Sequence, residues 1–177
     1  MVKVDKRTTL DILHTLDTYL EKYERKFPIY LIGGSALILR NVQEDSKDVD
    51  FITDSNGYLA LGKAVSRLER ELGIRIDVFK EGYIISYRYP DYHLRADKVL
   101  TLKHIEVYVL DYIDVILTKA LSGREIDRKR ILELKNKGII APRDELERRF
   151  SKVVPYRGKE QEIKTRFEDF LKDYYVD

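Results

Sequence analysis

Hydrophobic residues at helical spacing predict two long helices in the first half of the chain. Thr8 or Thr9 is expected to cap the first, whose inner positions are Leu10, Leu13, Leu16, Leu20 and Tyr23. Residues 58–72 form the second, and Gly73 fits its C-terminal cap. Its expected inner residues are Leu59, Leu61, Ala64, Val65, Leu68 and Leu72.

Short apolar runs between and after these helices predict strands over residues 29–32, 49–53 and 74–79. Gly33-Gly34-Ser35 interrupts the first run, and a short helix is expected over 36–40. Residues 83–109 lack helical periodicity and are expected to form further strands. From residue 111 the chain is expected to be helical, with breaks at Pro142 and Pro155.

This layout predicts an α+β fold, in which a small mixed β-sheet is flanked by helices. The expected core covers residues 1–110. Residues 111–177 are expected to form a helical C-terminal extension, packed on the core as one structural unit. A length of 177 residues, 44% of them hydrophobic, is enough for a core of this size.

The amino-acid composition limits which kinds of metal or catalytic site the chain can form. The chain has no cysteine, which excludes disulfides and thiolate chemistry, and its three histidines lie far apart without ligand spacing. Any metal is therefore expected to be a hard ion held by carboxylates. No apolar run is long enough to cross a membrane and no signal peptide is visible, so we expect a cytoplasmic protein without a membrane partner.

The charge of the chain is close to balanced but unevenly distributed. The net charge is +2, with 17 Lys/Arg and 19 Asp/Glu in residues 1–118 and 16 and 12 in residues 119–177. This permits an anionic partner without requiring one. The high content of charged residues, with one Met and no Cys, favours a thermophilic source.

The first candidate site is the pair of acids in Asp48-Val49-Asp50. Residues two apart in a strand point to the same face, about 6.6–7 Å apart along the chain, so Asp48 and Asp50 are expected side by side. Two such carboxylates repel each other unless a cation lies between them. Since Mg²⁺ prefers one or two carboxylates together with substrate phosphates, the pair is suited to holding a metal against a triphosphate.

Gly33-Gly34-Ser35 is the second candidate site, because a strand that ends there and turns into a helix leaves free backbone N–H groups. Those groups and the helix dipole favour an anion, and glycine lets the backbone approach a phosphate closely. The hydroxyl of Ser35 can add a donor.

A third acid is expected on the strand over 74–79. Asp77 lies between apolar residues, where a lone acid is costly without a partner, and Glu106 in Ile105-Glu106-Val107 is the alternative. Beside the pair of acids, either could bind a second ion and help to activate an attacking hydroxyl. The spacing fits neither the G-x-G-x-x-G of a Rossmann fold nor a P-loop.

Together these motifs resemble the nucleotidyltransferase-fold superfamily, which includes DNA polymerase beta, kanamycin nucleotidyltransferase and the small minimal nucleotidyltransferases. The resemblance covers residues 29–79 with specific motifs. It implies that Gly34 and Ser35 hold the triphosphate and that Asp48, Asp50 and Asp77 bind the metal.

The helical region also resembles the AbiEii-toxin-like members of this superfamily. By that resemblance Lys119, Arg124 and Asp127 belong to the functional set, although Arg130 replaces a second aspartate. A solvated helix face is the alternative for Lys119. Lys47 is expected either to offset charge on the triphosphate or to face solvent.

The resemblance implies transfer of a nucleoside monophosphate from an NTP to a hydroxyl acceptor, with release of pyrophosphate. Two Mg²⁺ ions are expected, with Mn²⁺ as a substitute. The acceptor is left open between an RNA end, a protein and a small molecule, and so is the oligomeric state. The alternative is an inactive nucleotide- or partner-binding module of the same fold, such as a toxin–antitoxin component.

Overall fold

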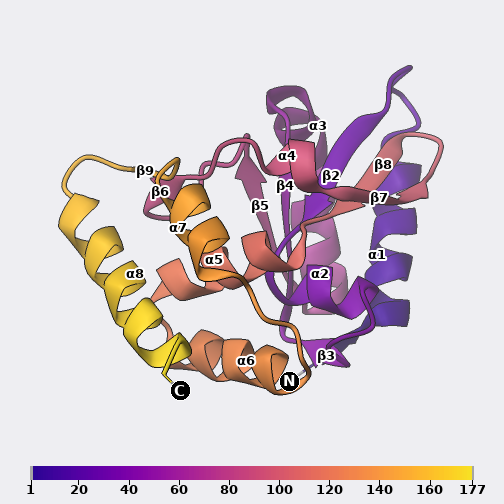
Figure 1. The fold of residues 1–177 in the computed structure, drawn as a ribbon. Coiled ribbons are helices and arrows are strands. Elements are labelled where there is room, and N and C mark those ends of the chain that lie inside the picture. The colour runs from indigo at the N-terminus through magenta and orange to yellow at the C-terminus, as the bar shows by residue number, and fades with distance from the viewer. Residues whose placement is uncertain (1, 177) are drawn as a thin grey trace. The chain divides into compact units, whose positions relative to one another are not determined.

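Two compact units share the chain, and their segments alternate along the sequence (Figure 1). The structure is a computed structural model that describes residues 2–176. The first unit runs to Gly82 and resumes over His93–Leu110; the second comprises Tyr83–Tyr92 and the chain from Asp111 onward. The expected core of residues 1–110 therefore contains one segment, Tyr83–Tyr92, that belongs with the helical unit.

A five-stranded mixed sheet forms the centre of the first unit, in the order β5-β4-β2-β8-β7. Strand β2 is antiparallel to β4 and parallel to β8, β5 is parallel to β4, and β7 is antiparallel to β8. A separate two-stranded ribbon pairs β1 with β3. The strands are β1 (Val4–Asp5), β2 (Phe27–Leu31), β3 (Asp45–Ser46), β4 (Asp48–Thr53), β5 (Arg75–Lys80), β7 (Asp97–Thr101) and β8 (Ile105–Val109). The predicted α+β class is confirmed.

The helices of this unit are α1 (Lys6–Tyr19), α2 (Gly33–Leu39) and α3 (Ser55–Leu72), and the short α4 (Tyr92–Arg95) lies where the chain returns to it. The expected cap of α1 is wrong: Asp5 precedes the helix and accepts a hydrogen bond from the Thr8 N–H at 2.7 Å. The expected cap of α3 is confirmed, since Gly73 ends it with a φ of +63°.

Helix α3 packs against β2, β4 and β5, and α1 packs against α3, so the core lies between these helices and the sheet. The interior positions of α3 are Leu61, Ala64, Val65 and Leu68, as predicted. The prediction for Leu59 is wrong: it is 79% exposed, because two residues before Leu61 places it on the opposite side of a helix. Leu72, at the end of the helix, is also exposed.

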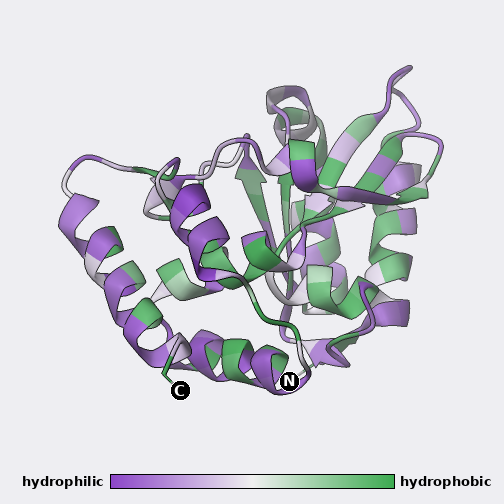
Figure 2. Ribbon diagram, in the orientation of Figure 1, coloured by the Kyte–Doolittle hydropathy of each residue, from purple (hydrophilic) through white to green (hydrophobic). Residues whose placement is uncertain are grey.

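Four helices form most of the second unit: α5 (Tyr112–Ser122), α6 (Glu125–Asn136), α7 (Arg143–Phe150) and α8 (Glu160–Tyr174). Helix α5 packs against the other three and is hydrophobic along most of its length, whereas α8 alternates hydrophobic and hydrophilic positions (Figure 2). The breaks predicted at Pro142 and Pro155 are confirmed: Pro142 directly precedes α7, and Pro155 ends β9 (Val154–Pro155), which pairs with β6 (Tyr87–Arg88).

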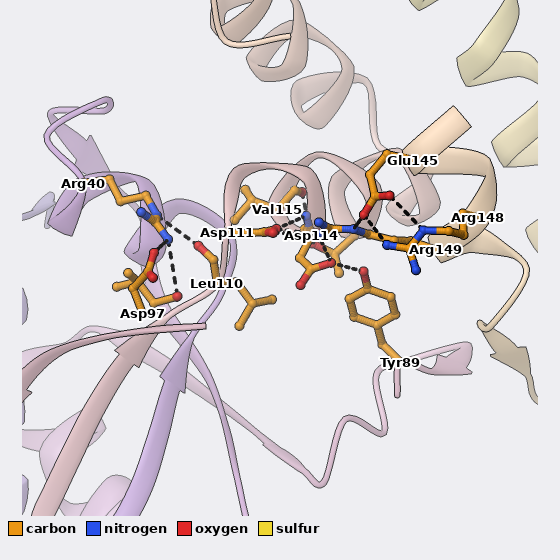
Figure 3. Close-up of polar contacts among 12 residues, drawn as sticks. Arg40, Tyr89, Asp97, Leu110, Asp111, Asp114, Val115, Glu145, Arg148 and Arg149 are labelled. Carbon is orange, nitrogen blue, oxygen red and sulfur yellow. Dashed lines mark hydrogen bonds and ion pairs between the residues drawn. The ribbon is translucent and has the colours of Figure 1, made fainter. Parts of the chain in front are cut away.

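A buried ionic cluster joins α5 and α7 in this unit (Figure 3). Nη1 of Arg149 lies 2.7 Å from carboxylate oxygens of both Asp111 and Asp114, and its Nε lies 2.7 Å from Glu145. The hydroxyl of Tyr89 donates a further hydrogen bond to Asp114. Burial disfavours the charge on Arg149, yet the hydrogen bonds to Asp111 and Glu145 and the charge of Asp114 raise its pKa overall.

None of the helices within residues 2–176 combines the length and the apolar character that a bilayer crossing requires.

Candidate functional site

Three carboxylates converge on the first unit's sheet. Strands β4 and β5 run parallel, with Asp50 opposite Asp77, and Asp48 lies two residues before Asp50 on the same face. One carboxylate oxygen from each residue lies within 4.8 Å of those of the other two, and all three residues are half-buried. This spacing is compatible with a shared hard cation, because carboxylate oxygens are its preferred ligands.

The alternation of β4 explains why these acids face outward from the core. Val49 and Phe51, between and after the two aspartates, are fully buried on the side covered by α3, and Ile76 of β5 is 4% exposed. Because strand residues alternate between faces, burying the hydrophobic set leaves both aspartates on the other face.

Gly33 begins the turn that faces these acids. Its φ of +56° lies in the left-handed region, and a Cβ built on it would lie 3.3 Å from Oδ2 of Asp50. The Ile32 N–H donates to the Asp50 carbonyl at 3.0 Å, which ties the turn to β4. Helix α2 starts here, so the N–H groups of its first turn have no acceptor within the helix. The short helix thus begins three residues before its predicted start.

The next two residues, Gly34 and Ser35, show how tightly the turn is packed. A Cβ on Gly34 would lie 2.7 Å from Oγ of Ser46, so only glycine fits without moving that side chain. Ser35 is fully buried, and its hydroxyl accepts a hydrogen bond from the Asp50 N–H at 3.1 Å. The observed contact of the Ser35 hydroxyl is therefore to the strand that carries the acids.

Two residues beside the acids were missed by the sequence interpretation. The hydroxyl of Ser46 donates to Oδ1 of Asp48 at 3.3 Å. Nε of Arg75 lies 2.9 Å from both carboxylate oxygens of Asp77. The hydrogen bond from Arg75 to Asp77 and the charge of Asp77 raise the pKa of Arg75, with smaller contributions from Asp48 and Asp50. Both lie two residues before an aspartate, so strand alternation is the signal that could have found them.

Glu106, the alternative third acid, lies elsewhere in the sheet. It is opposite Pro28, near the start of β2, whereas the acid cluster lies beyond the other end of that strand. Its carboxylate accepts hydrogen bonds from Lys98 at 3.0 Å and Tyr108 at 3.1 Å, and the bond from Lys98 is the largest cause of its lowered pKa. Lys47, between Ser46 and Asp48, is exposed.

Lys119 and Arg124 belong to the second unit, where both contact Asp127. Nζ of Lys119, which is 8% exposed, lies 2.9 Å from one Asp127 oxygen, while Arg124 and Ser122 donate to the other at 2.7 Å and 2.6 Å. Burial raises the pKa of Asp127, but the charge of Lys119 and these hydrogen bonds outweigh it and lower the pKa overall. The alternative of a solvated helix face for Lys119 is wrong, because its side chain is buried against Asp127. A role of Lys119 toward a nucleotide stays a prediction.

The family is decided by the match over residues 7–174 to the model described as "Nucleotidyltransferase of unknown function (DUF6036)". The chain belongs to this nucleotidyltransferase family. The acids and the glycine turn lie inside the matched region. No curated protein sequence matches the chain.

Among solved structures, the chain is similar to an antigenic nucleotidyltransferase-like protein from Paracoccidioides brasiliensis. The two share 12% sequence identity over 97% of this chain and 91% of that one, with a TM-score of 0.47.

Proposed function

We propose that this member of the family is an active nucleotidyltransferase, which transfers a nucleoside monophosphate from an NTP to a hydroxyl acceptor and releases pyrophosphate. The observation that carries the proposal is the convergence of Asp48, Asp50 and Asp77 within 4.8 Å, beside the glycine turn at which helix α2 begins. An inactive relative has no physical need to keep three acids together on an open face.

The donor set fits hard divalent cations. Three carboxylates are half-buried on one face, and Asp50 lies against Gly33, where the missing side chain leaves the approach open. Asp48 and Asp50 would hold two Mg²⁺ or Mn²⁺ ions, and Asp77 one of them. Such ions neutralise phosphate charge and lower the pKa of a bound hydroxyl.

The chain's own groups have separate roles in this proposal. The N–H groups of Gly33 and Gly34 bind the phosphates that leave as pyrophosphate. Ser35 positions the acids through the backbone of Asp50, and it acts on the phosphates only if its hydroxyl proton reaches them. Lys47 lies next to the acids in sequence and offsets triphosphate charge from the exposed side. Lys119 and Arg124 stay candidates for the nucleotide site.

The experiment is incubation of the full chain with each α-³²P-labelled NTP, Mg²⁺ and cell extract, followed by separation of labelled RNA, protein and small molecules. We expect label in one of these fractions and release of pyrophosphate, both abolished by chelation and by Asp48→Asn with Asp50→Asn. Glu106→Gln serves as the matched control, because Glu106 is an acid of the same sheet outside the cluster. Label in no fraction, with NTP binding retained, supports the inactive-module alternative.

A further inference from the structure

Arg75 contacts Asp77 of the acid cluster and has no role in the reaction proposed above. It lies directly opposite Asp48 on the neighbouring strand and two residues before Asp77, so all three side chains share one face of the sheet. Its side chain is 68% exposed, whereas that of Asp77 is 28% exposed. The guanidinium therefore covers the acid from the solvent side.

The contact leaves no oxygen of Asp77 untouched. Nε lies 2.9 Å from Oδ1 and 2.9 Å from Oδ2, so whichever oxygen serves as the metal ligand is already next to a positive charge. A divalent cation at the cluster and the guanidinium at this distance would repel each other. Metal binding and the Arg75–Asp77 contact are consequently in competition.

A bound triphosphate changes this competition. An arginine fork matches phosphate oxygens well, and an exposed side chain can move at low cost. The phosphates supply an anionic partner for the guanidinium at the moment the metal takes over Asp77.

We propose that Arg75 is a displaceable counter-ion that couples metal binding to triphosphate binding. It pairs with Asp77 in the metal-free protein, and it contacts the nucleotide phosphates when metal and nucleotide bind together. This inference rests on the proposed function of the acid cluster. It makes Arg75 a positioning residue for Asp77 in one state and a phosphate ligand in the other.

The test uses Mn²⁺ and inorganic tripolyphosphate as probes, because neither depends on the base of the nucleotide. Calorimetric titration of Mn²⁺ into the full chain gives the metal affinity, and titration of tripolyphosphate with Mn²⁺ in excess gives the phosphate affinity. Arg75→Gln should bind Mn²⁺ about two- to fivefold more tightly, the range expected from losing an exposed ion pair. It should bind tripolyphosphate about tenfold more weakly, because a charge-assisted contact is lost.

The opposite signs of these two changes distinguish the coupling from a merely structural ion pair. Arg70→Gln is the matched control, since Arg70 is an exposed arginine at the end of α3 outside the acid cluster, and it should change neither affinity. Mn²⁺ binding that is unchanged or weaker in Arg75→Gln overturns the proposal, and so does an unchanged tripolyphosphate affinity. If the wild-type chain binds no Mn²⁺ at millimolar concentration, the proposed function itself fails, and this coupling fails with it.

Discussion

Each unit contains a cluster of three carboxylates that an arginine contacts, but the two clusters differ in burial. In the second unit, Asp111, Asp114 and Glu145 surround Arg149, whose side chain is 8% exposed. In the first, Asp48, Asp50 and Asp77 face outward, and the side chain of Arg75 is 68% exposed. A buried counter-ion cannot be exchanged without breaking the packing around it, whereas an exposed one can. Burial of the cation thus separates a cluster closed to solvent from one whose carboxylates face outward.

The largest expected effect is on the transfer rate, and it comes from the outward-facing cluster of Asp48, Asp50 and Asp77, called the open cluster below. Asp48→Asn with Asp50→Asn should lower the transfer rate roughly 1,000-fold, because several kcal/mol of charge stabilisation is lost with the metal. The melting temperature should stay or rise, since two neighbouring like charges are removed. Initial rates and a thermal melt test this, and a variant that retains its rate would show that these acids are not the metal site.

The buried cluster around Arg149 should instead show its effect in the free energy of unfolding. Arg149→Met should cost about 3 kcal/mol of unfolding free energy, because Asp114 is fully buried and would lose its cation. Urea denaturation measures the change. Arg148→Gln is the control, because Arg148 lies on the same helix and its side chain is 57% exposed. Loss of this charge should barely change the midpoint of urea denaturation. Equal effects from both substitutions would contradict the comparison.

A smaller effect is expected at the turn beside the open cluster. Gly33→Ala should destabilise by about 1–2 kcal/mol, because its φ of +56° disfavours a side chain and the new Cβ would meet Asp50 at 3.3 Å. Gly62→Ala should instead gain about 0.5–1 kcal/mol, since nothing lies within 4 Å of its Cβ in the interior of α3. Denaturation midpoints of the pair should move in opposite directions, and a shared sign would refute the argument.

The smallest effect concerns pH. Hydrogen bonds from Arg148 first, and then Arg149, lower the pKa of Glu145 from 4.5 to about 2. A lowered folded-state pKa contributes stability above about pH 4.5 that is lost as the pH falls toward 2. Glu145→Gln should therefore lose less stability than the wild type between pH 5 and pH 3, as measured by urea midpoints. Parallel losses in the two proteins would remove Glu145 from the account of acid sensitivity.

Most strands and helices were predictable because their patterns are local. The alternation Asp48-Val49-Asp50-Phe51 determines which residues of β4 are buried. Asp77 lies on the neighbouring strand β5, opposite Asp50. The residues 83–109 were less predictable: strands occur there, but so does α4, and their assignment to two units depends on distant partners.

The candidate site was only partly visible in the sequence for a similar reason. Acids and glycines stand out by type, but the contacts of Ser46 and Arg75 depend on strand register, which a single sequence does not specify. The burial of Ser35 and the pairing of Lys119 with Asp127 likewise arise from packing across the chain.

The alternation of the two units along the chain has a consequence for how the protein is made. Tyr89 leaves the ribosome before helix α5, which contains its partner Asp114, and the intervening residues include β8, which lies in the sheet between β2 and β7. The segment Tyr83–Tyr92 is therefore synthesised first, and the helical unit can be completed only after the chain from Asp111 onward has been made. A fragment covering residues 111–177 would lack both Tyr89 and the strand that pairs with β9, so neither unit can be obtained whole by a single cut of the gene.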